Sequence, residues 1–296
     1  MLAEDVEINQ DASDVNKRVS VKFHNGKTLE GGMFIDCEGR SSLTRKLANP
    51  EHPEACTLPY KFVGSIVELT PEEYHALKAK YDPLLFQGTI PSSGTFFWFS
   101  LLSSPAHNGT SNYQCQVNIS WKLADGVANL PFESVKEAFA EVQKRTTGLH
   151  ESLTVLRDKL LKTGEKNYME LCLGDWPFAE WNDHNGLLLL AGDAAHAMVM
   201  YRGEAANHGI ADVKLLEGIL ESYLKEGGSW NKFAAKYQTK LRERAKPGVL
   251  MSRQACYDAH NWNKIVSSLA IGTNKGKSCT GDEVSTPLLS SRAKKS

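Results

Sequence analysis

The 296-residue sequence lacks several features that mark common classes of protein. Its six cysteines are widely spaced and form no C-x-x-C pair, which argues against a zinc site and against a disulfide framework. No apolar run approaches the roughly 18 residues that span a membrane, and the first ten residues lack the basic and apolar zones of a signal peptide. We therefore expect a cytoplasmic protein with reduced thiols and no membrane partner.

An excess of charge of one sign is absent as well. Lysine and arginine total 34 against 35 aspartates and glutamates, a net charge of -1, so no nucleic-acid partner is expected. The sequence has no G-x-S-x-G elbow, which excludes a serine hydrolase of that type. Asp193, His196 and His208 could be taken for a metal trio, but the turn directs them differently, and no metal is predicted. The oligomeric state is left open.

What the sequence does have is 41% hydrophobic residues, enough for a sizeable core, and strand-like patterns in its first half. Val19, Val21 and Phe23 alternate with polar residues. The Asn25-Gly26 pair that follows them predicts a hairpin turn. Three longer strand-like segments come later, namely KFVGSIVEL, GTFFWFSLL and YQCQVNISWKL. Together these patterns predict an antiparallel sheet.

One helix interrupts these segments and two more follow them. Thr70, Pro71 and Glu73 have the pattern of a helix cap, first helical residue and capping-box partner. Residues 132–162 carry spaced apolar positions among charges, which predicts two amphipathic helices. The aromatic run at 96–99 could line a substrate pocket, but an alternating core strand has the same residues, and core packing is favoured.

A different pattern occupies residues 187–224. Leu187 to Ala191 form an unbroken apolar run, which is typical of a strand buried on both faces. The small residues of Gly192 to Ala195 follow, and apolar residues then recur at helical spacing up to Leu224. This order predicts a strand, a tight turn, and a helix that begins near residues 202–206.

A strand, turn and helix in this order can form a ligand site. Small residues at the turn let a ligand approach the backbone, and a helix start offers unpaired N–H groups with partial positive charge. Asp193, fixed at the end of a strand, is an acceptor suited to a sugar or polyol hydroxyl. The residues are equally compatible with an ordinary strand-turn-helix in which Asp193 only caps the backbone.

The segment GDAAHAMVMYRGEAANHGIAD, residues 192–212, resembles the second flavin fingerprint of the FAD-dependent aromatic-ring and secondary-metabolite monooxygenases. These include the salicylate hydroxylase-like and p-hydroxybenzoate hydroxylase-like flavoproteins. Upstream, CEGRSSLTR at residues 37–45 is similar to the family's A-D-G-x-x-S-x-V-R fingerprint, with Gly39, Ser42 and Arg45 in register. The resemblance extends over most of the chain, up to about residue 265.

The resemblance implies a cofactor, FAD, and residues that would contact it. Asp193 would bind a ribityl hydroxyl, and the backbone of 203–207 would face the pyrimidine end of the flavin ring, where helix amides stabilise negative charge. The implied cofactor-binding residues are Gly192, Asp193, Ala194, Gly203, Ala205, Ala206, Asn207, Glu38, Gly39 and Arg45. Glu38 and Gly39 would lie near the pyrophosphate and the nicotinamide cofactor's approach, and Arg45 would hold that loop electrostatically. Tyr201 is the candidate for substrate contact, and no catalytic side chain is identified.

The implied activity is hydroxylation or epoxidation of an aromatic or secondary-metabolite small molecule, with NAD(P)H as reductant and O2 as oxidant. The implied fold is α/β, a partial Rossmann-like FAD-binding domain with an inserted antiparallel-sheet substrate domain. Residues 1–50 and 180–270 would form the FAD-binding part with its C-terminal helices. Residues 51–179 would form the substrate domain, and 271–296 a disordered tail.

Some family features are missing. Glu38 replaces the usual Asp, Met200 a frequent Pro, and Ala205 a Gly; a positive φ at Ala205 would cost on the order of 1 kcal/mol. None of the 23 glycines forms the G-x-G-x-x-G turn that holds the ADP half of FAD. We therefore expect a truncated chain whose FAD binding is weak or absent. The alternative is a catalytically silent remnant that acts at most as a binding or interaction module.

Overall fold

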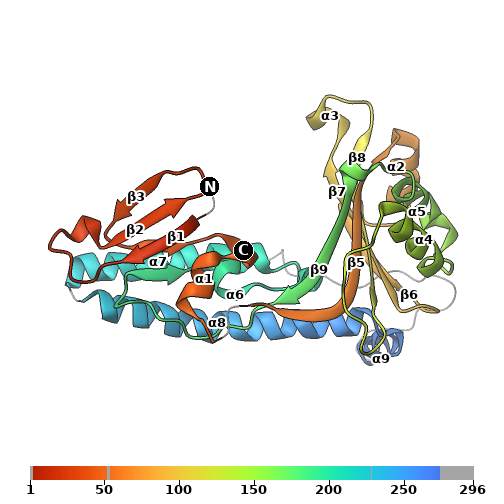
Figure 1. Ribbon diagram of the computed structural model, residues 1–296. Coiled ribbons are helices and arrows are strands. Elements are labelled where there is room, and N and C mark those ends of the chain that lie inside the picture. Colours follow the sequence, from red (N-terminus) through yellow and green to blue (C-terminus); the bar gives the residue numbers. More distant parts are fainter. Residues whose placement is uncertain (1–2, 52–53, 228, 274–296) are drawn as a thin grey trace. The chain divides into compact units, whose positions relative to one another are not determined.

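The computed structural model describes residues 3–51, 54–227 and 229–273. The chain divides into two compact units (Figure 1). The first unit comprises residues 1–58 and 174–256, and the second comprises 59–173 and 257–296. The domain boundaries expected from the sequence stay a prediction. The expected tail lies, from residue 274 on, outside the described residues.

A five-stranded sheet is the framework of the second unit, with strand order β6-β7-β8-β5-β9. The pairs β6–β7, β7–β8 and β5–β8 are antiparallel, which confirms the predicted antiparallel sheet. The longest ladder runs from Tyr60 opposite Lys122 to Leu69 opposite Tyr113. The strands are β5 (Cys56–Leu69), β6 (Leu85–Ile90), β7 (Thr95–Ser103), β8 (Tyr113–Lys122) and β9 (Tyr168–Asp175). The N-terminal end of β5 and the C-terminal end of β9 belong to the first unit.

Helices cover one face of this sheet and enclose an apolar core. Phe97 and Phe99 lie in that core, which confirms core packing for them, whereas Phe96 and Trp98 alternate onto the opposite face. The helices that contribute to this core are α2 (Pro71–Lys78), α4 (Val135–Arg145) and α5 (Thr154–Leu160). The unit also contains α3 (Pro105–Asn108), α9 (Trp262–Thr273) and the 3-10 turns η3 (Glu151–Leu153) and η4 (Glu165–Asn167). The pair α4 and α5 confirms the two helices predicted for 132–162.

The first turn of α2 confirms the predicted capping box. The Thr70 hydroxyl accepts a hydrogen bond from the Glu73 backbone N–H at 3.3 Å, and the Glu73 carboxylate accepts one from the Thr70 N–H at 2.9 Å. Two backbone donors that the helix leaves unpaired are thereby satisfied.

The first unit begins with a three-stranded antiparallel sheet, in order β1-β2-β3. Its strands are β1 (Ala3–Ile8), β2 (Val19–Phe23) and β3 (Thr28–Gly31), with the 3-10 turn η1 (Val15–Lys17) between the first two. Gly26 has φ +79° in the turn between β2 and β3, so the hairpin predicted at Asn25-Gly26 is confirmed.

A short parallel pair, β4 (Phe34–Asp36) and β10 (Leu188–Leu190), forms the centre of the first unit. Leu189 and Leu190 are fully buried, which confirms the predicted buried strand. Helix side chains complete this core, including Phe233 and Leu241, and the Tyr237 hydroxyl donates to the Leu190 carbonyl at 3.0 Å. The other elements are η2 (Gly39–Ser41), α1 (Leu43–Ala48), α6 (Asp193–His196), η5 (Met200–Arg202), α7 (Ala205–Glu226) and α8 (Trp230–Ala259).

The mixed α/β class expected from the sequence is confirmed, with a parallel strand pair in the first unit and an antiparallel sheet in the second. Over the part of the chain that the structure describes, no helix combines the length and the apolar character needed to cross a membrane.

Candidate functional site

The chain turns sharply where β10 ends. The Ala191 N–H still donates to the Asp36 carbonyl at 2.9 Å, and Gly192 then has φ 60° and ψ −141°. That conformation is open almost only to glycine. The one-turn helix α6 starts at Asp193, and α7 begins at Ala205, so the predicted order of strand, turn and helix is confirmed.

Asp193 lies half-buried at the start of α6. Burial raises the pKa of its carboxyl, and the nearby charges of His196, Arg40 and Arg45 oppose that rise. No hydrogen bond engages this carboxylate within the described residues. Because the carboxylate is only partly buried and receives no hydrogen bond from the described residues, a ligand hydroxyl could donate to it.

The upstream motif folds into η2 and α1, and η2 lies against α6. Asp36, at the end of β4, is fully buried and accepts hydrogen bonds from the Ser42 hydroxyl and, at 2.7 Å, from the Glu38 N–H. Ser42 also caps α1 by accepting the Arg45 N–H at 2.8 Å. Gly39 has φ +79°, and the Glu38 carboxylate accepts the Ala3 N–H. The motif is therefore a rigid loop tied to β1 and β4.

Arg45 is only 1% exposed. Its Nη2 donates to the Arg40 carbonyl at 2.8 Å, and its guanidinium carbon lies 4.8 Å from the centre of the Trp176 ring. The Nε and Nη1 groups have no hydrogen-bond partner within the described residues. Burial is the main reason that the pKa of this guanidinium is lowered. Two donor groups on a buried cation are thus unpaired, and Asp193 lies near enough to interact with that charge.

The start of α7 brings together the remaining predicted residues. Gly203 has φ 64° and precedes Glu204, whose side chain does not cap the helix. Ala205 is the first helical residue and has no positive φ, so the strain considered for it does not arise. Ala206 and Asn207 are exposed in the first turn. The uncapped amides of this turn are free to meet an electron-rich group.

Two more of the predicted residues, besides Arg45, are buried. Ala194 is inaccessible inside α6. Tyr201, in η5, is 5% exposed and hydrogen-bonds to the thiol of Cys256, whose pKa burial raises to about 12.

A buried charged cluster, which sequence reasoning missed, adjoins the turn. The Asp212 carboxylate accepts the Gly192 N–H and bonds to His196 Nε2, each at 2.7 Å, and it pairs with Arg244. Arg244 Nη1 also contacts His208 Nδ1 at 2.7 Å. Burial and then the charge of Arg244 lower the pKa of His208, which favours a neutral imidazole. The sequence signal for this cluster was Asp212, an acidic residue on the face of α7 that is partly buried.

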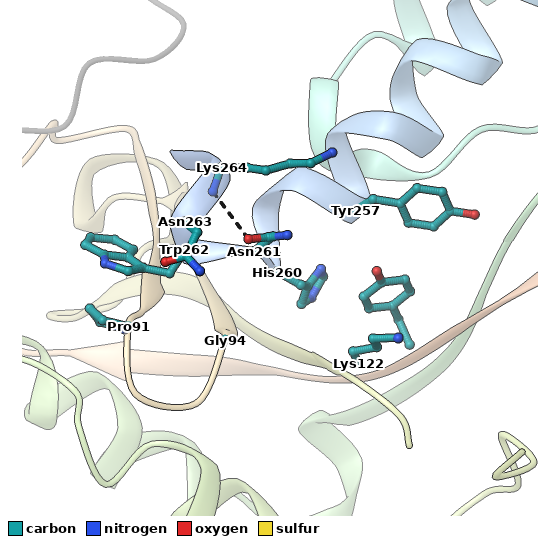
Figure 2. Close-up of a pocket in the computed structure, with 10 residues that line it drawn as sticks. Pro91, Gly94, Lys122, Tyr257, His260, Asn261, Trp262, Asn263 and Lys264 are labelled. Carbon is teal, nitrogen blue, oxygen red and sulfur yellow. Dashed lines mark hydrogen bonds between the residues drawn. The ribbon is translucent and has the colours of Figure 1, made fainter. Parts of the chain in front are cut away.

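The second unit has a separate pocket of about 430 Å³ that contains no residue predicted from the sequence. It is lined by Tyr60, Pro91, Gly94, Lys122, Tyr257, His260, Asn261, Trp262, Asn263 and Lys264. Figure 2 shows Tyr257, His260 and Lys264 around it, with the Lys264 N–H donating to the Asn261 side chain at 3.3 Å. Lys122 pairs with Asp125 at 3.1 Å and Lys264 with Asp258 at 3.0 Å, so both lysine charges are balanced.

Comparison with known proteins identifies relatives of the chain, although no protein-family model matches it. It is 34% identical over 210 residues to the FAD-dependent monooxygenase dbaB of Emericella nidulans, covering 67% of this chain and 51% of that protein. It is 30% identical over 297 residues to a probable FAD-dependent monooxygenase of Arthroderma benhamiae, covering 92% and 68%.

A solved structure has a similar fold. Klebsiella pneumoniae HpxO, complexed with FAD and uric acid, superposes with a TM-score of 0.67 at 15% identity, covering 92% of this chain and 61% of that one. The chain thus spans between 51% and 68% of the length of these proteins.

Proposed function

We propose, because the chain belongs to the family of FAD-dependent monooxygenases, that the turn after β10 in the first unit binds the ribityl and flavin part of FAD. The first unit would then be a partial Rossmann-like FAD-binding domain. We propose further that the protein hydroxylates or epoxidises an aromatic or secondary-metabolite small molecule with NAD(P)H and O2.

The observation that carries the proposal is the state of Asp193. Its carboxylate lies half-buried at a strand end, its pKa is raised by burial, and no described residue donates a hydrogen bond to it. A ribityl hydroxyl is a donor of the right kind, because it would satisfy the carboxylate without adding charge.

The backbone beside Asp193 is open enough for a ligand. A Cβ atom built on Gly192, Gly203 or Gly39 would meet nothing within 4 Å, and all three glycines have positive φ. The space at these positions, together with the uncapped start of α7, supports close approach of a planar ring and its polyol chain. The positive charge of Arg45, buried next to this loop, favours the negative charge of a pyrophosphate through electrostatic attraction.

Each residue would have a defined part in binding. Asp193 accepts from the ribityl chain, while Gly192 and Ala194 keep the turn small. The first-turn amides of α7, from Ala205 to Asn207, face the pyrimidine end of the ring and stabilise negative charge that develops there. Bound FAD would supply the redox chemistry that activates O2.

The upstream loop would bind the phosphate side of the cofactor. Gly39 presents backbone to it, and Glu38 fixes the loop to β1 through the Ala3 N–H. Arg45 supplies the cation. The same loop would lie along the approach of NAD(P)H. Tyr201 stays the candidate for substrate contact that the family resemblance suggests, although its side chain is 5% exposed in this structure.

The test is FAD binding by the purified chain, measured by visible absorption and by quenching of flavin fluorescence. Replacing Asp193 with Ala is expected to weaken FAD affinity at least tenfold, whereas Asp11→Ala, at an exposed position of the same unit, leaves it unchanged. A colourless protein that also ignores added FAD would contradict the proposal and favour the catalytically silent remnant.

A further inference from the structure

Asp212 of α7 binds both ends of α6. One carboxylate oxygen, Oδ2, accepts the N–H of Gly192, the residue before the helix, and bonds to Nε2 of His196, the last helical residue, each at 2.7 Å. Asp212 and His196 are both fully inaccessible to solvent. A side chain in a different helix thus spans the turn on which the proposed FAD contact lies.

The turn depends on this carboxylate for its unusual backbone. Gly192 has φ 60° and ψ −141°, and its N–H finds an acceptor only in Asp212 among the described residues. The other nitrogen of His196, Nδ1, is buried without a hydrogen-bond partner, so among the described residues only Asp212 orients the ring by a hydrogen bond. Removing the carboxylate would leave a buried backbone donor and a buried imidazole unpaired.

Arg244 of α8 forms an ion pair with Asp212 in this buried environment. Its guanidinium pairs with the second carboxylate oxygen, Oδ1, and its other terminal nitrogen contacts His208 Nδ1. Because the pKa of His208 is lowered, His208 adds no second positive charge. Three donors therefore surround one carboxylate, which satisfies the condition under which a buried charge is tolerated.

We propose that Asp212 is a positioning residue that holds the Gly192–His196 turn in the conformation that presents Asp193 to the ligand. The link to FAD rests on the proposed function. Asp212 itself does not contact the cofactor in this scheme, because its two oxygens are already occupied by Gly192, His196 and Arg244.

The first measurement needs no cofactor. Hydrogen exchange in the ligand-free protein is followed for a peptide covering residues 188–198, which contains the Gly192 amide. Asp212→Ala is expected to accelerate exchange at this peptide at least tenfold, because the acceptor of the Gly192 N–H is lost. Asp212→Asn keeps an acceptor oxygen and should return exchange to within about threefold of wild type.

A matched control exists in the same unit. Asp175 is also fully buried and also pairs with an arginine of α8, Arg253, at 2.8 Å between Oδ2 and Nε. It belongs to β9 and makes no hydrogen bond to the turn within the described residues. Asp175→Ala removes a comparable ion pair, so it reports what general destabilisation alone does to the 188–198 peptide.

The second measurement is FAD affinity of the same three variants. Asp212→Ala should weaken binding at least tenfold, Asp212→Asn by less, and Asp175→Ala by no more than about twofold. If wild type binds no FAD, the proposed function fails while the exchange result still decides the positioning role. Equal exchange at 188–198 in Asp212→Ala and Asp175→Ala, or unchanged exchange in Asp212→Ala, would overturn it.

Discussion

The two units bury different kinds of residue. The core of the second unit consists of apolar and aromatic side chains between a sheet and its helices. Among the described residues of this unit, one lysine, Lys61, is buried, and it pairs with Glu170. Around the parallel pair of the first unit, Asp36, Asp212 and Arg45 are buried, each less than 2% exposed. The first unit therefore buries more charged side chains than the second.

This difference helps to distinguish residues that stabilise the fold from residues that are candidates for binding. Buried charges cost free energy unless partners compensate them, and groups that remain uncompensated often mark functional sites. Arg45 keeps two unpaired donors and Asp193 an unpaired carboxylate, whereas Asp212 and Asp175 are fully paired. In the proposed function the unpaired groups would meet the ligand, and the paired groups would hold the site in shape.

The largest effect is expected from a cavity in the second unit. Phe99 is 1% exposed and stacks on Phe86 with ring centres 4.6 Å apart. Replacing it with Ala should lower the free energy of unfolding by about 3–5 kcal/mol, measured by urea denaturation. FAD affinity of the folded fraction should stay within twofold of wild type. A large loss of FAD affinity in this variant would show that binding in the first unit is not independent of packing in the second.

A smaller effect should come from the turn itself. Gly192→Ala should cost about 1–3 kcal/mol through backbone strain, because the residue has a positive φ. An added Cβ meets no atom within 4 Å, so a steric clash does not contribute. Gly218→Ala in α7 is the control: it too has open space, but its φ is not positive. Helix propensity should make that change stabilising by roughly 0.5–1 kcal/mol. Thermal unfolding should show a lower melting temperature for Gly192→Ala and a higher one for Gly218→Ala. A change of the same sign in both variants would argue that strain at Gly192 is unimportant.

The smallest effect concerns pH. Burial raises the pKa of Asp193, so the folded state holds the proton more tightly than the unfolded chain does. Stability then falls as pH rises through the folded-state pKa, and Asp193→Asn should be more stable than wild type at neutral pH by about 0.5–1 kcal/mol. Unfolding curves between pH 7 and the usual Asp pKa of about 3.9 should show this difference shrinking as the pH falls. A constant difference would exclude the carboxyl as its source.

Local patterns predicted much of the fold. The capping box at Thr70, the hairpin at Asn25-Gly26 and the buried strand ending at Leu190 are each encoded by a few adjacent residues. Side-chain period and turn chemistry act over that range, so the sequence was sufficient for them.

The cluster that supports the turn could not be predicted in the same way. Gly192 meets Asp212 and Arg244 only after α7 and α8 have packed, and nothing adjacent to Asp212 in sequence signals that contact. Arg45 likewise contacts Trp176, although the residues of the second unit separate the two in sequence. The resemblance identified the turn, whereas the tertiary contacts reveal what holds it. The roles of the cofactor-binding residues remain proposals.

The wide sequence separation within β4–β10 has a consequence for the order of folding. The β7–β8 pair joins neighbouring strands, so it can form as soon as both have left the ribosome. β4 must instead wait for β10, and the turn after β10 must wait again until Arg244 of α8 is synthesised. We therefore expect the turn that is proposed to bind FAD to be among the last parts of the molecule to mature, after most of the scaffold is already in place.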